Sequence, residues 1–231
     1  MKILGIIPAR GGSKGVPRKN LKMLGNSPLI AYTWESAQQS QLLSDIILSS
    51  EDDAIIDWAK NNGLEVPFVR PKALATDTAS SIDVVIHAIN TLERQNKYYD
   101  AVCLLQPTYP FREKGFIDKA LEKFIKSNAD SLISVLKVPH EYNPHWTFCE
   151  NEKGFLKIAT GENEIIKRRQ DLPLAYFRDG NIYITRVEVI KSQQSFYGDK
   201  ISFIESDESF YCNIDTMEDW IKAETIFSKL Q

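Results

Sequence analysis

The residue types best suited to binding phosphate gather in one short segment near the start of the chain. Residues 8–20 read PARGGSKGVPRKN, with three glycines, the hydroxyl of Ser13 and four cationic side chains. Glycines let backbone N–H groups approach an anion closely, and Arg and Lys add charge-assisted hydrogen bonds to phosphate oxygens. The segment therefore predicts a loop that wraps a triphosphate, with a flexible basic surface loop as the alternative.

Two common nucleotide-binding patterns are absent from this segment. A Walker A loop places Ser or Thr after its Gly-Lys pair, whereas here Lys14 is followed by Gly15. The GxGxxG pattern of dinucleotide-binding folds is also missing. The loop is predicted to bind its ligand at the end of the apolar strand that precedes it, where open α/β sheets hold their ligands.

Positive charge is concentrated around this loop. Residues 1–34 contain six Lys or Arg side chains and no Asp or Glu, whereas residues 35–231 contain 22 basic and 31 acidic side chains. Nucleic-acid binding usually needs a basic face spread over much of a domain. A small anion is therefore the predicted ligand, and no nucleic-acid partner is expected.

The composition is typical of a folded, soluble domain. The 231 residues are 43% apolar and 26% charged, and no apolar run approaches the roughly 18 residues of a membrane span. Cys103, Cys149 and Cys212 are sparse and odd in number, which argues against a disulfide framework and for a reducing compartment. We expect a cytoplasmic protein that does not insert into a membrane.

Apolar strands alternate with amphipathic helices along most of the chain. Strands are predicted at residues 2–8, 45–49, 66–69, 101–105, 131–138 and 182–185. Helices are predicted from about residue 28, from a capping box at Ser50 and Asp53 to Gly63, over 82–92 and 113–126, and from a capping box at Thr216 and Asp219. This alternation predicts an α/β fold with a doubly wound, mainly parallel sheet and helices on both faces, in one domain spanning residues 1–231.

Residues 139–175 interrupt the alternation. They contain prolines and glycines near their ends, several aromatic side chains and the short apolar run FLKIA. An insertion with apolar content but little room for a core packs on a second subunit or covers a site. We predict an inserted β arm here, with a flap over the site as the alternative to a dimer contact.

Four further motifs follow the loop along nearly the whole chain. They read RPKALATDTASS at 70–81, LLQPTYPFR at 104–112, RRQDLPLAYFRDGNIYI at 168–184 and NIDTMEDW at 213–220. With the loop, they resemble the signatures of the acylneuraminate cytidylyltransferases, a family that includes the CMP-sialic acid synthetases. The resemblance implies a Rossmann-like fold with a dimerisation arm, the substrates CTP and an acidic nine-carbon sugar, Mg²⁺ as cofactor, and a homodimer.

The resemblance also implies roles for individual residues. The nucleotide-binding positions are Arg10, Ser13, Lys14, Lys19, Asn20, Arg70, Ala79 and Ser81. The sugar-binding positions are Gln106, Arg169, Tyr183, Phe196 and Tyr197, with Arg169 pairing with the sugar carboxylate. The catalytic charges are Arg10, Lys14, Lys19 and Asp215. Arg10 and Lys19 are expected in an exposed loop, so that their removal weakens nucleotide use without unfolding the protein.

Simpler structural roles compete with some of these assignments. Ser80 and Ser81 can cap the helix that begins before Asp83, and this role is compatible with a nucleotide contact. The run KRR at 167–169 can form a solvated face, and lone aromatic residues such as Tyr183 more often belong to a core.

The predicted metal position departs from the family. Its sialic-acid members tend to read DID, whereas this chain reads NID at 213–215. Alternation within a strand would point Asn213 and Asp215 to one face, where both could reach a single Mg²⁺. Either Asp215 carries the metal alone, or the chain uses another sugar or nucleotide. The spacing of His140, His145 and Cys149 fits no common zinc site.

These motifs predict a nucleotidyltransferase. The anomeric hydroxyl of a 2-keto acid sugar would attack the α-phosphorus of CTP, and pyrophosphate would leave. Positioning and charge would supply most of the catalysis, and the motifs offer no obvious general base. The alternatives are a related enzyme for another nucleotide or a sugar phosphate, and a nucleotide-binding module without turnover. The motifs do not distinguish sialic, legionaminic and pseudaminic acid.

Overall fold

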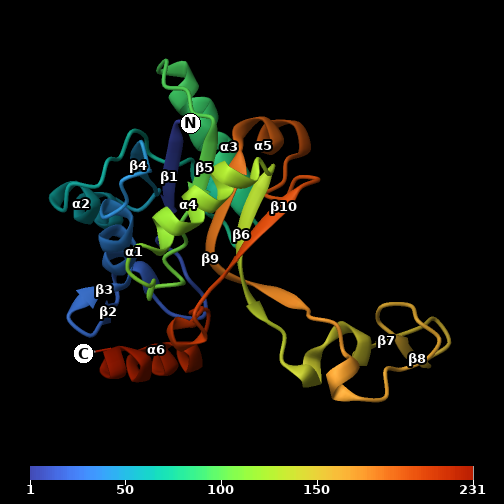
Figure 1. Cartoon of the computed structure of the whole chain (residues 1–231). Helices are drawn as coiled ribbons and strands as arrows, with labels where there is room; N and C mark the ends of the chain where they lie inside the picture. The colour runs from blue at the N-terminus through green and yellow to red at the C-terminus, as the bar shows by residue number, and fades with distance from the viewer. Residues whose placement is uncertain (231) are drawn as a thin grey trace. The chain divides into compact units, whose positions relative to one another are not determined.

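The computed structural model describes residues 1–230, which form two compact units (Figure 1). The first unit comprises Met1–Ser134 and the chain from Asp179 onward, and the second unit is Val135–Arg178. None of the helices in residues 1–230 combines the length and apolar character of a membrane span.

A six-stranded sheet forms the centre of the first unit. In spatial order its strands are β10 (Ile201–Glu205), β6 (Ser131–Lys137), β9 (Tyr176–Arg186), β5 (Ala101–Leu104), β1 (Ile3–Pro8) and β4 (Asp45–Ser49). β1 pairs in parallel with β4 and β5, as expected of an apolar strand buried on both faces. β9 runs antiparallel to β5, with Tyr183 opposite Leu104. The sheet is therefore mixed.

Helices cover both faces of the sheet (Figure 1). They are α1 (Leu29–Gln38), α2 (Asp53–Asn61), α3 (Ser81–Arg94), α4 (Phe116–Ser127), α5 (Val187–Gln193) and α6 (Met217–Leu230). Ile3 and Ile7 of β1 pack in one buried cluster with α1, α2 and α4, whereas Leu4 and Ile6 pack in another with α3 and α5. Successive residues of a strand point to opposite faces, so this division confirms the predicted doubly wound α/β fold.

A third buried cluster joins α6 to the glycine-rich loop. Trp220 and Ala223 of α6 pack with Val16 of the loop and with Ile214. The predicted capping box begins this helix, because Thr216 N–H donates to Asp219 Oδ2 at 2.8 Å and Asp219 N–H donates to Thr216 Oγ1 at 3.2 Å. The cluster holds the loop against the segment that carries Asp215. Short elements complete this unit: η1 (Lys19–Leu21), β2 (Met23–Leu24), β3 (Ser27–Pro28), η2 (Lys72–Ala75) and η6 (Glu208–Phe210).

The second unit contains the segment predicted as a β arm. It consists of η3 (His140–Tyr142), η4 (Pro144–Trp146), β7 (Phe148–Glu150), β8 (Leu156–Ile158) and η5 (Arg169–Asp171), besides the ends of β6 and β9. β7 and β8 form an antiparallel hairpin. Asn151 fixes its turn by accepting hydrogen bonds from the N–H groups of Lys153 and Phe155. The strands of this segment are short, because its prolines and glycines interrupt regular pairing.

The strand predicted at residues 66–69 is wrong. Only an isolated parallel bridge between Ile47 and Glu65 is present, where Leu48 N–H donates to the Glu65 carbonyl at 2.8 Å. Pro67 has no N–H group to continue the ladder, so the pairing ends where the predicted strand would begin.

The predicted start of α2 is also wrong. Asp52, not Ser50, caps this helix, since Asp52 Oδ1 accepts from Ile55 N–H at 3.0 Å. The hydroxyl of Ser50 instead accepts from Asp52 N–H at 3.2 Å. Ser50, which directly follows β4, therefore orients Asp52, the residue that caps the helix.

We expect Asp52→Ala to lower the free energy of unfolding by about 0.5–2 kcal/mol, because the substitution leaves the Ile55 N–H without its cap. Asp53→Ala is the matched control, since Asp53 lies in the first turn of α2 without capping it. That variant should lose only a few tenths of a kcal/mol, roughly, through the helix dipole. Urea denaturation measures both, and equal losses would contradict the assignment of the cap.

Candidate active site

A cavity of about 260 Å³ opens at the carboxyl ends of β1 and β5. It is lined by Pro8, Arg10, Gly12, Ser13, Lys19, Asn20, Arg70, Leu74, Thr76, Asp77, Ala79, Ser81, Val84, Gln106, Pro107, Thr108 and Asp215. Nine of these residues are predicted site residues, brought together from four separate motifs. This is the edge of an open α/β sheet where ligands bind.

The glycine-rich loop touches the segment that carries Asp215. A Cβ atom on Gly15 would lie 1.9 Å from the Asp215 carbonyl oxygen, so only glycine fits this contact. Lys19 Nζ donates to the Ile214 carbonyl at 2.6 Å and lies 3.2 Å from Asp215 Oδ1. The side chain of Lys19 is only 11% exposed, so the expectation of an exposed lysine is wrong. Packing against residues far away in sequence, which the loop alone does not reveal, explains the difference.

Two loop cations share one carboxylate. Arg10 Nη2 lies 3.0 Å from Asp77 Oδ1, and Lys14 Nζ lies 2.7 Å from Asp77 Oδ2. Lys14 does not itself line the cavity but reaches it through this pair. The hydrogen bond from Lys14 and the charge of Arg10 hold the pKa of the Asp77 carboxyl below its ordinary value. Asp77 was not among the predicted site residues, although it stands in the RPKALATDTASS motif.

Arg70 is held by a second carboxylate. Its Nη2 donates to Glu51 Oε2 at 2.8 Å, and the side chains of Arg70 and Glu51 are 3% and 13% exposed. Glu51 Oε1 also accepts from Gly11 N–H at 2.8 Å. Glu51 thereby joins Arg70 to the loop backbone. Its place directly after β4, at the same sheet edge as the loop, was the available signal for finding it.

Asn20 and Ser81 lie in the cavity with clear structural roles around them. Asn20 Nδ2 donates to the Arg10 carbonyl at 2.9 Å, so this amide fixes the loop. Ser80 caps α3, since its hydroxyl accepts from Asp83 N–H at 3.2 Å. Ser81, the first residue of α3, is left to line the cavity. Ser80 therefore caps the helix, and Ser81 lines the cavity.

The predicted sugar-binding residues separate into two groups. Gln106 lines the cavity, and a Cβ atom on Gly180, whose φ is +86°, would lie 3.9 Å from Gln106 Oε1. Tyr183, Phe196 and Tyr197 pack instead in the buried cluster of α3 and α5, where the first two rings lie 5.9 Å apart. Arg169 is an exposed residue of η5 in the second unit.

Asp215 and Asn213 lie in an irregular segment, not in the strand that was predicted. Their side chains nevertheless meet, because Asn213 Nδ2 donates to Asp215 Oδ2 at 3.0 Å. Asp215 is 63% exposed at the edge of the cavity. Among residues 1–230, no group of three or more His, Cys, Asp or Glu side chains is arranged to hold a metal ion. A metal here would need oxygen ligands from its substrate, which is how proteins commonly hold Mg²⁺.

No side chain in the cavity has the environment of a nucleophile or a histidine base. The cavity lining contains neither His nor Cys. Burial raises the pKa of the Cys212 thiol to about 11, and burial also raises the pKa of Cys103. The arrangement supplies cations, hydrogen-bond donors and two exposed carboxylates, Asp77 and Asp215, which suits binding and stabilising phosphate groups.

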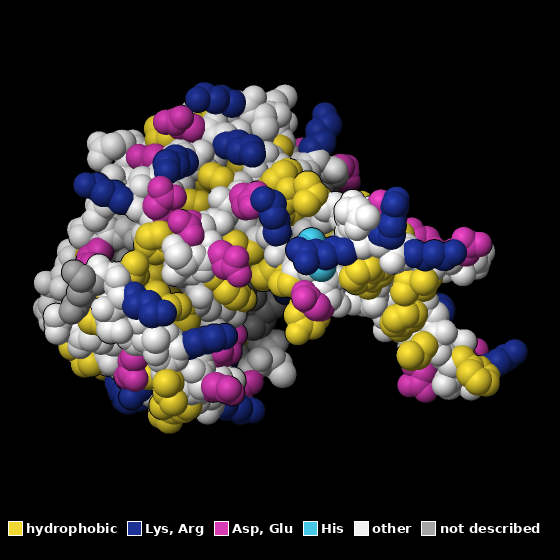
Figure 2. All heavy atoms as spheres, turned by 60° about the horizontal axis from the view of Figure 1, so that its bottom comes forward, with side chains coloured by type: hydrophobic (Ala, Val, Ile, Leu, Met, Phe, Trp, Pro, Cys, Tyr) yellow, Lys and Arg dark blue, Asp and Glu magenta, His cyan; other side chains and the backbone are white. Residues whose placement is uncertain are grey.

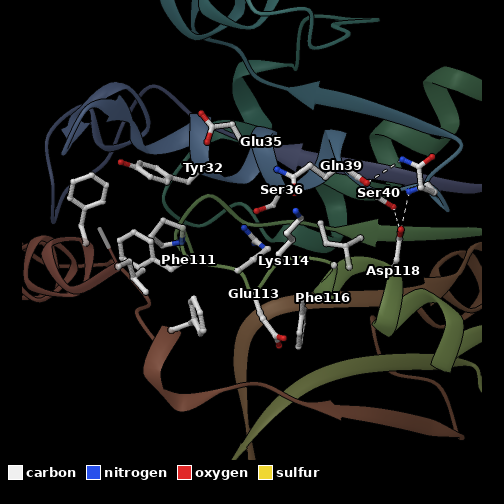
Figure 3. A pocket seen from close by; sticks show the side chains of 18 residues that line it. Tyr32, Glu35, Ser36, Gln39, Ser40, Phe111, Glu113, Lys114, Phe116 and Asp118 are labelled. Atoms are coloured by element: carbon white, nitrogen blue, oxygen red, sulfur yellow. Dashed lines mark hydrogen bonds between the residues drawn. The ribbon is translucent and has the colours of Figure 1, made fainter.

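A second cavity of about 760 Å³ lies between α1, residues 110–118 and α6 (Figure 3). Its aromatic wall includes Tyr32, Phe111 and Phe227. Asp118 faces the start of the loop after α1, where it accepts from Ser40 Oγ and from Gln41 N–H. None of the predicted site residues lines this cavity. The cavity that the glycine-rich loop lines is therefore the candidate active site, although the second cavity is larger.

Comparison with known proteins identifies the family of the chain. Residues 4–225 match the family described as cytidylyltransferase. The chain is 36% identical over 227 residues to a pseudaminic acid cytidylyltransferase of Campylobacter jejuni, covering 98% of this chain and 97% of that protein. It is 34% identical over 236 residues to CMP-N,N'-diacetyllegionaminic acid synthase of Legionella pneumophila, covering 98% and 96%.

A solved structure shares the fold. CMP:2-keto-3-deoxy-manno-octonic acid synthetase complexed with CTP superposes with a TM-score of 0.74 at 15% identity, covering 100% of both chains. The family match and the relatives show that the chain is a nucleotidyltransferase. The chain belongs to the cytidylyltransferase family, which confirms the family predicted from the motifs.

We expect Lys14→Ala to raise the pKa of Asp77, because the hydrogen bond from Lys14 is the largest influence that lowers it. Titration of the Asp77 carboxyl carbon by NMR measures the change. Lys119→Ala removes a comparable exposed ion pair with Glu113 and should leave Asp77 unchanged. An Asp77 pKa that is the same in Lys14→Ala and in the unmodified protein would contradict the ion-pair geometry.

Proposed function

We propose that this cytidylyltransferase transfers CMP from CTP to a nine-carbon 2-keto acid sugar of the sialic, legionaminic or pseudaminic acid type and releases pyrophosphate. The observation that carries the proposal is the gathering of four separate motifs around one cavity at the sheet edge. The names of the two relatives, which both refer to nine-carbon acidic sugars, point to the same acceptor.

The triphosphate would take the place of Asp77 on the loop cations. Arg10 and Lys14 already hold a carboxylate there, and phosphate oxygens offer the same charge with more acceptors. Ser13 and the loop N–H groups would complete the cradle. Lys19, fixed between Ile214 and Asp215, would place its charge beside the reacting phosphate.

The rest of the cavity would hold the nucleoside. Arg70 and Ser81 line it from one side, with Ala79 between them in the motif, and Asn20 lines it from the loop. Arg70 is kept in place by Glu51, so its guanidinium is oriented before the ligand arrives. Asn20 and Ala79, which line the cavity, would contact the base or the ribose.

The sugar would be oriented by Gln106 at the end of β5. The amide of Gln106 can donate to and accept from sugar hydroxyls, and Pro107 stiffens the turn that follows it. Arg169 would pair with the sugar carboxylate, and Tyr183, Phe196 and Tyr197 would line the sugar pocket. The motif at 168–184 supports the roles of Arg169 and Tyr183. The roles of Phe196 and Tyr197 rest on the family resemblance alone.

Mg²⁺ is the proposed cofactor, with Asp215 as its protein carboxylate and Asn213 as a neutral oxygen ligand. The donor set fits, because Mg²⁺ is usually bound by one or two carboxylates together with substrate phosphates and water. When bound, Mg²⁺ would neutralise charge on the phosphates. Lys19 shares Asp215 and would help to orient its carboxylate.

The chemical step needs little covalent help from the protein. A bond forms between the anomeric oxygen and the α-phosphorus while the bond from that phosphorus to the β-phosphate oxygen breaks, and the hydroxyl proton leaves to water. Arg10, Lys14 and Lys19 would stabilise the negative charge that develops on the phosphates. In-line placement of the two substrates would supply most of the remaining acceleration.

The neutral Asn213 favours one second candidate, a sibling enzyme for another nucleotide or a sugar phosphate. Pyrophosphate release with each of the four nucleoside triphosphates, plus sialic, legionaminic and pseudaminic acid, separates the cases when products are identified by mass spectrometry. The proposal predicts CMP-linked acidic sugar. Turnover with a different nucleotide, or nucleotide binding without any turnover, would overturn it.

The partners and compartment follow from charge and cysteine content. Basic and acidic side chains are interspersed over the face drawn in Figure 2, a pattern that suits a small anionic substrate better than a nucleic acid. The three cysteines are free in the structure. We place the enzyme in the cytoplasm, where CTP is made and thiols stay reduced.

We expect Arg10→Ala and Lys19→Ala each to weaken CTP binding by about ten- to a hundredfold, the cost of one charge-assisted hydrogen bond. Isothermal titration measures the affinity. Lys22→Ala is the control, because Lys22 lies over the Trp220 ring outside the cavity. Lys19→Ala should also lower the melting temperature, since the Ile214 carbonyl loses its donor. Unchanged CTP affinity in both variants would refute the triphosphate loop.

We expect Asp215→Asn to reduce turnover by at least about a hundredfold, because it removes the charge that faces the metal. Asn213→Asp should be tolerated and should tighten Mg²⁺ binding. Initial rates over a range of Mg²⁺ concentrations test both variants. Full activity and ordinary Mg²⁺ dependence in Asp215→Asn would show that the metal is held elsewhere.

We expect the protein to be a homodimer in which the arm, residues 139–175, contacts the partner. Large apolar side chains are exposed in this segment, among them Phe155 and Leu156, both 68% exposed. Light scattering at micromolar concentration should give a dimer, and Leu156→Asp should weaken it. Ile125→Asp, on an exposed position of α4, is the control. A fully active monomer would contradict this proposal.

A further inference from the structure

Arg112 is a buried cation whose hydrogen bonds all go to uncharged oxygens. Only 8% of the surface of Arg112 is exposed to solvent. Nη1 donates to Thr33 Oγ1 at 2.9 Å, Nη2 donates to the carbonyls of Gln106 and Asn181 at 3.0 Å each, and Nε donates to the Asn181 carbonyl at 3.3 Å. Among residues 1–230, no carboxylate forms an ion pair with it.

These bonds join three elements at the edge of the candidate active site. Thr33 belongs to α1, Gln106 follows β5, and Asn181 lies in β9. Gln106 lines the nucleotide cavity, and Gly180, next to Asn181, lies against the side chains of Gln106 and Asn213. One guanidinium therefore fixes the backbone on both sides of the Gln106 side chain.

A lysine could not reproduce the hydrogen bonds that Arg112 makes. The planar guanidinium presents its donors in a fixed fork, which a lysine amine cannot reproduce. Burial lowers the pKa of Arg112 to about 10, with ionisable neighbours that include Asp179 partly offsetting the effect, so the side chain remains charged near neutral pH. Burying a cation without an ion pair costs free energy, which the four hydrogen bonds of Arg112 offset.

We propose that Arg112 is a positioning residue that holds Gln106 and the Gly180–Asn181 backbone in the geometry that receives the acidic sugar. Its buried charge also favours the negatively charged substrates that occupy the neighbouring cavity. This inference rests on the proposed function for the identity of the sugar. The contacts that Arg112 makes do not depend on that identity.

Arg186 provides a matched control. Its Nε donates to the Ala129 carbonyl at 2.9 Å, and its guanidinium lies over the Phe124 ring at 5.8 Å. Arg112 has the same kinds of contact, with its guanidinium 5.8 Å from the Tyr109 ring. Arg186 lines neither of the two cavities described here. Arg186 is less buried than Arg112, and it serves as the control for loss of a guanidinium away from the active site.

The second cavity gives access to Arg112 from outside. Arg112 is among the residues that line this cavity, which is drawn in Figure 3. At about 760 Å³ it is large enough to admit small molecules. A guanidinium ion can therefore enter the space that Arg112→Ala leaves.

The experiment compares Arg112→Lys, Arg112→Ala, Arg186→Lys and Arg186→Ala. We expect both Arg112 variants to lose about ten- to a hundredfold in kcat/KM for the acidic sugar while CTP affinity changes much less. Low, non-denaturing guanidinium should restore part of the activity of Arg112→Ala and none of any activity lost in Arg186→Ala. Arg112→Lys, which keeps the charge, provides the measurement if Arg112→Ala does not fold.

A second readout is independent of turnover. The side-chain amide signal of Gln106 in an NMR spectrum, identified by its loss in Gln106→Met, should shift in Arg112→Lys and stay in place in Arg186→Lys. An unshifted signal together with unchanged kcat/KM in Arg112→Lys would overturn the inference. A shifted signal in a protein that uses no acidic sugar would leave Arg112 as a positioning residue and refute the proposed function instead.

Discussion

The cations of the glycine-rich loop are paired with carboxylates of the same chain, and the geometry of the site depends on this pairing. Asp77 holds Arg10 and Lys14, Asp215 holds Lys19, and the loop would otherwise carry unbalanced positive charge at one sheet edge. Repulsion among unpaired cations would oppose the packing of Val16 and the Asn20 hydrogen bond that hold the loop in place. The carboxylates therefore help to keep the loop in one conformation in the absence of a ligand.

The ion pairs of the site differ in how easily a ligand can displace the carboxylate from its cation. Asp77 is 42% exposed, and exposed ion pairs contribute only about 0–1 kcal/mol, so a triphosphate can displace this carboxylate at small cost. Arg70 and Glu51 are nearly buried, and breaking a buried pair leaves an uncompensated charge. The Glu51 pair is thus a fixed part of the site, whereas the Asp77 pair is exchangeable. Arg112 extends the fixed part toward Gln106 without any carboxylate.

Much of this fold and part of this site could be predicted from the sequence. Apolar runs and glycine positions identified β1, β4, β5 and the loop, because strand burial and turn chemistry are local. The strand at 66–69 failed because its pairing depends on which N–H groups meet β4, and Pro67 has none. Asp77 and Glu51 were missed because their partners lie far away in sequence, and the burial of Lys19 depends on Ile214 for the same reason.

The central claim is that nucleotide phosphates replace Asp77 on Arg10 and Lys14. A crystal structure determined with CTP and Mg²⁺ tests it most directly. The account predicts phosphate oxygens within hydrogen-bond distance of both cations, about 2.7–3.2 Å, with Asp77 turned away and Asp215 facing the metal. CTP bound at this sheet edge with both Asp77 ion pairs intact, or CTP bound in the second cavity, would contradict it.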